Sequence, residues 1–172
     1  MIPPREAPGH IRIASYNIRK CIGLDRRRDP ERTLSVINAL DADIVVLQEA
    51  DRRLGRRPAA IPRRLLRHHS YYVPVALATN TVSLGWHGNA ILVRPHIKIM
   101  ESERIEIPSF EPRGAVLTEL EFNAARLRIV GLHLGLIRRH RRRQLAALVA
   151  SLAERPPMPT IIAGDFNEWA HI

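Results

Sequence analysis

The run Ile161-Ile162-Ala163-Gly164-Asp165-Phe166-Asn167 decides how the rest of this sequence is interpreted. Its apolar part is too short for a helix and predicts a last buried strand over residues 159–163. If the chain stays extended beyond that strand, Asp165 and Asn167 project to the same side. One of them could then accept a proton while the other donates a hydrogen bond. An ordinary Asx turn after a strand is the alternative interpretation of the same residues.

Three other apolar runs end in a polar side chain in the same way, at Asn17, Glu49 and His133. Because α/β proteins place their ligands at the carboxyl ends of strands, we expect these side chains to meet Asp165 on one rim. Such a rim suits Mg²⁺, which binds one or two carboxylates together with waters and phosphate oxygens. We predict Glu49 as the chief metal ligand and Asn17 as a direct or water-mediated one. Alternatively, the Asn17 amide satisfies backbone groups at a strand end.

The first half of the chain is predicted to form a strand, a helix and a second strand. The strand covers residues 11–16, and the helix begins after Asp29, which can cap it, with Pro30 suited to the first helical position. The apolar, β-branched run at 43–47 then predicts a buried strand, so these segments form one βαβ unit. Residues 1–9 are predicted to be a flexible lead-in, and 10–172 a single domain.

The second half is predicted to be rich in antiparallel strands and to end in a helix and a strand. A short helix is expected at 63–68 within an Arg-rich loop, and strands are expected at 71–77, 89–93, 97–107, 115–122 and 126–132. The final helix should cover 138–154. Its buried stripe is predicted from helical spacing and consists of Leu145, Leu148, Val149 and Leu152.

The composition favours one compact domain with an affinity for polyanions. The chain has 172 residues, 45% of them apolar, and its 27 Lys and Arg against 17 Asp and Glu give a net charge of +10. All but Lys20 and Lys98 of these basic residues are Arg, 25 in number. The positive electrostatic field of such a chain attracts nucleic acid, phosphorylated metabolites or an anionic membrane face. The preference for arginine over lysine would also follow from GC-rich codon usage.

The sequence also bears on the cellular compartment. The longest apolar stretch is well below the ~18 residues of a membrane-spanning helix, and the first residues lack the apolar core of a secretory signal. Cys21 is the only cysteine, so an intrachain disulfide is excluded. A cytoplasmic protein is therefore expected.

An arginine run follows His133 and opens the predicted final helix. Positive side chains at a helix N-terminus oppose the macrodipole unless an anion binds among them. We expect these arginines to bind phosphate. Alternatively, they form a helix face exposed to solvent. The run consists of Arg138, Arg139, Arg141, Arg142 and Arg143.

Five short motifs, in this order along the chain, resemble those of the endonuclease/exonuclease/phosphatase superfamily. They are Ser-Tyr-Asn-Ile at 15–18, Leu-Gln-Glu at 47–49, Gly-Asn-Ala-Ile-Leu-Val-Arg at 88–94, Gly-Leu-His-Leu at 131–134 and Gly-Asp-Phe-Asn at 164–167. The resemblance implies an α/β fold, a four-layer αββα sandwich of two mixed sheets. It also implies a phosphoesterase that uses Mg²⁺, with Mn²⁺ as the alternative cation, and forms no covalent enzyme intermediate.

The resemblance also implies roles for particular residues. Asn17 and Glu49 fall at the metal site and His133 at the phosphate-contacting histidine. Asp165 and Asn167 fall at the pair that handles water and phosphate. Two further residues resemble positions that line the pocket, with a turn amide and a surface arginine as the alternatives: Asn89 and Arg113.

One motif of the superfamily has no counterpart. Its members end with a further strand pair and an Asp-His motif, and His171 is too close to Asn167 to supply that histidine. A fragment of a longer reading frame, or a truncated product with impaired chemistry, would explain the difference, and an apolar face or sheet edge should then be uncovered.

Two functions are compatible with these observations. The first is a metal-dependent phosphate-ester hydrolase in which activated water attacks in line. The second is a basic module that binds nucleic acid or anionic lipid without turnover. Nucleic-acid diesters, inositol phosphates and phospholipid headgroups all remain open as substrates, as does the oligomeric state.

Overall fold

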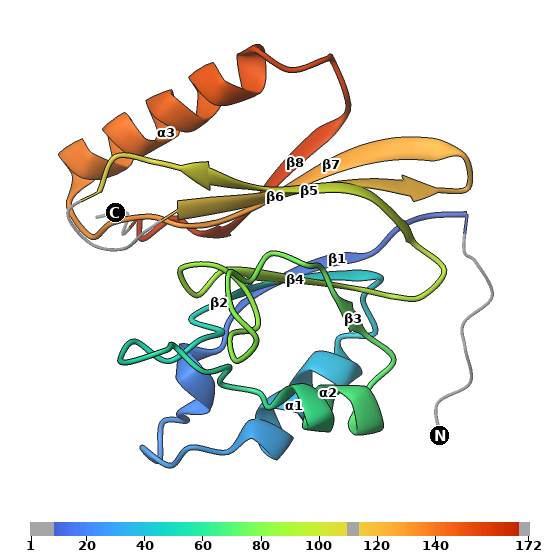
Figure 1. Ribbon diagram of the computed structural model, residues 1–172, viewed down its shortest axis with the longest axis vertical. Helices are drawn as coiled ribbons and strands as arrows, with labels where there is room; N and C mark the ends of the chain where they lie inside the picture. The colour runs from blue at the N-terminus through green and yellow to red at the C-terminus, as the bar shows by residue number, and fades with distance from the viewer. Residues whose placement is uncertain (1–8, 110–113, 169–172) are drawn as a thin grey trace.

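The protein is a four-layer sandwich in which two sheets face each other and helices cover their outer faces. The computed structural model describes residues 9–109 and 114–168, so most of the predicted lead-in lies outside the described residues. Helices α1 and α2 lie below one sheet and helix α3 lies above the other, as Figure 1 shows. The predicted αββα sandwich of two mixed sheets is therefore confirmed.

The first sheet has the strand order β1-β2-β4-β3. Strand β1 (Ile13–Asn17) pairs in parallel with β2 (Ile44–Gln48), while β4 (Ala90–Val93) and β3 (Val73–Pro74) are antiparallel to their neighbours. Helix α1 (Pro30–Ala39) connects β1 to β2, which confirms the βαβ unit. The side chain of Asp29 caps α1 by accepting from the backbone N–H of Arg32 at 2.9 Å. Helix α2 (Arg63–His69) packs beside α1.

The second sheet has the order β5-β6-β7-β8. Strands β5 (Lys98–Glu106), β6 (Gly114–Phe122) and β7 (Ala125–His133) form an antiparallel meander, and β8 (Thr160–Asp165) joins β7 in parallel. Helix α3 (Arg138–Ala153) makes the crossover from β7 to β8. A parallel pair requires such a crossover, because two parallel strands cannot be joined by a tight turn.

Apolar side chains form three core layers: one between α1, α2 and the first sheet, one between the two sheets, and one between the second sheet and α3. Strand β2 is buried along its whole length because both of its faces are covered. Val45 and Leu47 point toward α1 and α2, whereas Ile44 and Val46 point toward the second sheet. Between the second sheet and α3, the core includes Leu148.

Gly131, on β7, faces the first sheet at close range. A Cβ atom at this position would lie 2.8 Å from Val46 Cγ1 and 3.1 Å from Val116 Cγ2. Both distances are shorter than ordinary van der Waals contact, so glycine is required here. This close contact lies on β7, two residues before His133.

Three sequence-based expectations differ from the structure. Val149 is 59% exposed, because the buried face of α3 is centred on Arg141, Gln144 and Leu148 instead. Strand β8, which the sequence predicts to be buried, is an edge strand within the described residues, and Ile161 is 39% exposed. Strand β3 has two residues rather than seven, since only Val73 and Pro74 pair with β4 as a strand, opposite Val93 and Leu92.

In the ranges 9–109 and 114–168, no helix is long and apolar enough to cross a membrane.

Candidate active site

Four strands end at one edge of the molecule, where the two sheets meet. The parallel register of β1 and β2 places Asn17 beside Gln48, and that of β7 and β8 places His133 beside Asp165. Strand β1 lies against β8 across the two sheets. The carboxyl ends of all four strands therefore converge, as expected from the polar residues that follow them.

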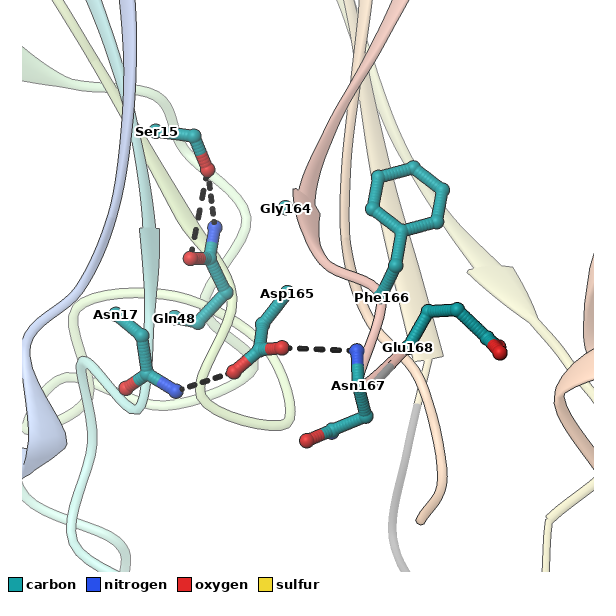
Figure 2. A pocket seen from close by; sticks show the side chains of 8 residues that line it. All are labelled: Ser15, Asn17, Gln48, Gly164, Asp165, Phe166, Asn167 and Glu168. Carbon is teal, nitrogen blue, oxygen red and sulfur yellow. Dashed lines mark hydrogen bonds between the residues drawn. The ribbon is translucent and has the colours of Figure 1, made fainter. Parts of the chain in front are cut away.

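An open cavity of about 340 Å³ lies at this seam (Figure 2). Polar side chains from β1 and β2 face the polar end of β8 across it. Its lining residues are Ser15, Asn17, Gln48, Gly164, Asp165, Phe166, Asn167 and Glu168.

Asp165 is the hub of the hydrogen bonds in this cavity. Its Oδ2 accepts from Asn17 Nδ2 at 2.9 Å and lies 3.7 Å from His133 Nε2. Its Oδ1 accepts from the backbone N–H of Asn167 at 2.9 Å, so both oxygens are held (Figure 2). A carboxylate oriented in this way can position or deprotonate a water molecule that enters the cavity.

The backbone at Asn167 differs from the extended chain on which the sequence-based interpretation depended. The chain is not extended there, because Asn167 has a φ of +49° and its N–H bonds back to the Asp165 side chain. This is the Asx turn that was the alternative interpretation. The Asn167 amide is buried and donates to the carbonyl of Leu134 at 2.8 Å, so it ties the end of β8 to the end of β7. One of its two N–H hydrogens remains for another acceptor.

Gly164 allows β8 to present Asp165. Its φ is +154°, and a Cβ there would lie 2.0 Å from the carbonyl oxygen of Leu132. Any side chain would therefore push β8 away from β7 at the residue next to Asp165.

Glu49 follows β2 directly and is not among the residues that line the cavity, but it interacts with Asn17 and His133 at the same strand ends. It has a φ of +52°, a strained conformation for a non-glycine residue, and such conformations gather at functional sites. Its carboxylate pairs with Lys20 Nζ. Burial alone would raise the pKa of Glu49, but the hydrogen bond and charge of Lys20 outweigh it, with smaller help from the charge of His133 and the amide of Asn17. The net pKa of Glu49 is below its ordinary value, which keeps it ionised.

Lys20 is a site residue that the sequence analysis missed. It belongs to the short 3₁₀ helix η1 (Arg19–Cys21), which follows β1, and its side chain is 22% exposed. The sequence did offer one indication that Lys20 has a special role, because it is one of two lysines in a chain with 25 arginines.

The remaining predicted site residues lie elsewhere or are not described. Asn89 is buried, and its Nδ2 donates to the carbonyl of Gly114 at 2.9 Å, which links the first sheet to the second. It is not among the residues that line the cavity. Arg113 and His171 lie outside the described residues.

The arginine run at the start of α3 divides into two kinds of residue. Arg141 is buried, donates to the carbonyl of Leu136 at 2.6 Å and pairs with Glu168. Contrary to the expectation from the sequence, it is therefore not available to bind a phosphate. The other members are exposed at the rim beyond His133; they are Arg138, Arg139, Arg142 and Arg143.

The donor atoms at this edge fit a hard divalent cation. Glu49 and Asp165 supply carboxylate oxygens, and Asn17 supplies an amide oxygen that accepts from the Arg19 N–H at 3.0 Å. Within the described residues, no group of three or more His, Cys, Asp or Glu side chains forms a metal cage. A site with so few carboxylates suits Mg²⁺ better than Zn²⁺, because Mg²⁺ retains waters and shares substrate oxygens.

The fold and this edge define the class of protein: an αββα sandwich with a polar site at the seam of its sheets. The model of the Endonuclease/Exonuclease/phosphatase family matches residues 14–171. The chain belongs to this family, whose fold is of the phosphoesterase and nuclease type. It is also 31% identical over 179 residues to the protein named "Uncharacterized protein YbhP" of Escherichia coli K12, covering 98% of this chain and 71% of that protein.

Solved structures share the same fold. A humanized D. rerio TDP2 carrying 14 mutations is 25% identical with a TM-score of 0.71, and the match covers 92% of this chain and 63% of that one. The human Nocturnin catalytic domain with bound sulfate is 23% identical with a TM-score of 0.68, and the match covers 92% and 65%. The chain thus spans less than two thirds of each of these two structures.

Proposed function

We propose that the protein is a divalent-metal-dependent hydrolase of phosphate esters in which water attacks the phosphorus in line. The observation that carries this proposal is the position of Asp165, held by Asn17 from the other sheet and facing His133. Family membership supports a phosphoesterase, and the polar seam supports this location for its chemistry.

Each side chain at the seam has a separate role in the proposed hydrolysis. Asp165 orients the attacking water and accepts its proton, because both of its oxygens are fixed by neighbours. His133 and the second N–H of Asn167 donate to phosphate oxygens as negative charge grows on them. Glu49, with the amide oxygen of Asn17, would hold Mg²⁺ or Mn²⁺. When bound, such a cation supplies Lewis-acid polarisation of the phosphoryl group.

The arginines at the rim favour a polyanionic substrate. Four exposed guanidiniums at the start of α3 have no acidic residue in the first turn of their helix to balance them. Together with the net charge of +10, they would draw a phosphate-bearing chain toward the seam. A nucleic-acid strand fits this distribution, because its phosphates repeat at regular spacing. The predicted cytoplasmic location is compatible with this substrate and stays a prediction.

A phosphatase and phosphodiesterase assay tests the proposal. Release of p-nitrophenol from p-nitrophenyl phosphate and from bis(p-nitrophenyl) phosphate should need Mg²⁺ or Mn²⁺ and stop in EDTA. Glu49→Gln and Asp165→Asn should each remove it, whereas Glu31→Gln, which removes an exposed carboxylate on α1, should not. Turnover that survives both site variants would end the proposal.

The second candidate function is binding of a polyanion without turnover. The same exposed arginines of α3 favour it. Binding of a labelled oligonucleotide that weakens steeply with salt, with no product after prolonged incubation in Mg²⁺, would support this function over hydrolysis.

A further inference from the structure

Lys20 lies on the carboxylate that the proposed function assigns to a metal. We infer that Lys20 is the internal counter-ion of Glu49, which a divalent cation must displace in order to bind, so that Lys20 sets the metal affinity of the site. The inference rests on the proposed function, because it takes Glu49 as the metal ligand. Lys20 acts through Glu49 and is a positioning residue.

The backbone is shaped to bring Lys20 to Glu49. Arg19, Lys20 and Cys21 have φ values of +46°, +56° and +63°, three consecutive left-handed conformations in residues other than glycine. Each is unfavourable for an L-residue, so the surrounding structure must hold the run in place.

The contacts that hold this run are visible on both sides of it. The N–H of Lys20 donates to the Glu49 carbonyl at 3.1 Å, and the N–H of Cys21 donates to the Ile18 carbonyl at 2.7 Å. The Cys21 side chain is buried in the core below the first sheet. Lys20 therefore approaches Glu49 through both its backbone and its ammonium group.

The environment makes this pair stronger than a surface ion pair. The side chains of Lys20 and Glu49 are only 22% and 18% exposed. Partial burial reduces screening by water and salt. Because the ammonium lies at Oε2, a cation that takes this oxygen must move it, and like charges at one carboxylate repel each other.

The chemistry of lysine suits a counter-ion that can be displaced. The chain uses arginine at 25 of its 27 basic positions, yet it has lysine here. A guanidinium is a planar fork that binds a carboxylate through two hydrogen bonds, whereas an ammonium is compact and sits on a flexible four-carbon stem. Lys20 can therefore release Glu49 by rotation of its side chain alone.

Calorimetric titration of Mn²⁺ into the metal-free protein tests the inference. Lys20→Met should bind Mn²⁺ about tenfold more tightly than the wild type, since no half-buried ion pair has to be broken. Lys20→Arg keeps the charge and can hold the carboxylate through two hydrogen bonds, so it should bind Mn²⁺ more weakly than the wild type, by about threefold or more. Lys98→Met is the matched control: it removes the other lysine, which is 66% exposed on β5, and should leave the affinity unchanged.

Thermal melting gives a second measurement that does not depend on turnover. Saturating Mn²⁺ should raise the melting temperature of Lys20→Met by more than that of the wild type, because tighter binding stabilises the folded state more. If Lys20→Met fails to fold in EDTA, Lys20→Gln provides a neutral side chain that still donates a hydrogen bond. Unchanged or weaker Mn²⁺ binding in folded, neutral Lys20 variants would overturn the inference.

Glu49→Gln separates this inference from the proposed function. If Glu49→Gln binds Mn²⁺ as the wild type does, Glu49 is not the ligand and the proposed metal site is wrong. If Glu49→Gln loses Mn²⁺ while the neutral Lys20 variants bind it no more tightly than the wild type, only the role of Lys20 is wrong.

Discussion

Asn17 and Asp165 stand 148 positions apart in the chain, yet the Asn17 amide donates to the Asp165 carboxylate at 2.9 Å. The first residue ends β1 and the second ends β8, so this hydrogen bond links the two sheets. The candidate site is therefore built on the seam between sheets rather than within either of them (Figure 2).

Removal of the Asn17 amide should disturb both folding and chemistry. We expect Asn17→Ala to lower the free energy of unfolding by about 1 kcal/mol, because a hydrogen bond to the partly buried Asp165 carboxylate, 31% exposed, is removed. It should lower kcat by about tenfold to a hundredfold, since Asp165 is no longer held. Urea titration and steady-state kinetics measure the two effects. Ser15→Ala is the control, because Ser15 lines the same cavity from the same strand and bonds Gln48 instead. Equal kinetic losses in both variants would contradict a specific role for Asn17.

The ion pair of Glu103 and Arg155 gives a prediction about pH. Arg155 donates to the two oxygens of Glu103 at 2.6 and 2.8 Å and ties β5 to the chain after α3. Hydrogen bonding from Arg155 lowers the pKa of Glu103, against a smaller opposing effect of burial. The stabilisation is therefore fully present above the ordinary glutamate pKa and is lost as pH falls through the lowered one.

Glu103→Gln is the variant that tests this pH dependence. At pH 7 it should cost about 0.5 kcal/mol, because the Glu103 side chain is 40% exposed. Denaturant titrations of both proteins from pH 7 to about pH 3 should show the difference shrinking only below the pKa of an ordinary glutamate. A difference that grows on acidification would contradict the assigned ion pair.

Gly131 should be intolerant of any side chain. A methyl group there meets Val46 and Val116 from two different strands, so Gly131→Ala should destabilise the fold by about 1–3 kcal/mol through overpacking. Gly9→Ala is the control, because nothing lies within 4 Å of a Cβ at that position. Chemical denaturation measures both, and equal stability of the two variants would show that the sheets can separate at no cost.

The rim arginines should govern binding of polyanions. Replacing Arg138 and Arg139 with Gln should weaken binding of a single-stranded oligonucleotide and lower the salt slope by about 0.7 for each phosphate that is no longer neutralised. Arg64→Gln with Arg67→Gln removes the same charge from exposed positions on α2, on the outer face of the other sheet, and should have little effect. Fluorescence anisotropy over a range of salt concentrations makes the comparison. Equal losses in the two double variants would indicate attraction by net charge alone.

Much of the architecture could be predicted from local patterns. Asp29 and Pro30 mark the start of α1 because capping is a property of a few adjacent residues. Strand β2 is predictable from an apolar, β-branched run between polar residues, which is typical of a strand covered on both faces. Within each sheet, the meeting of Asn17 with Gln48 and of His133 with Asp165 follows from polar residues at the ends of parallel strands. The contact of Asn17 with Asp165 depends in addition on how the two sheets pack against each other.

What the sequence did not predict depends on contacts between distant parts of the chain. Arg141 resembles the other arginines of its run, and only the packing of α3 shows that it is buried against Glu168. Lys20 reaches Glu49 through three left-handed residues, and no pattern of hydrophobicity predicts that conformation.

The link between β1 and β8 has a consequence for how the proposed activity would be lost on heating. Each sheet keeps its own ladder of hydrogen bonds, whereas the site depends on the distance between the sheets. A small hinge-like opening would part Asn17 from Asp165 while every strand remained paired. Inactivation should therefore begin at a lower temperature than the loss of the circular dichroism signal of the strands. The difference between the two temperatures would measure how strongly the two sheets are held together.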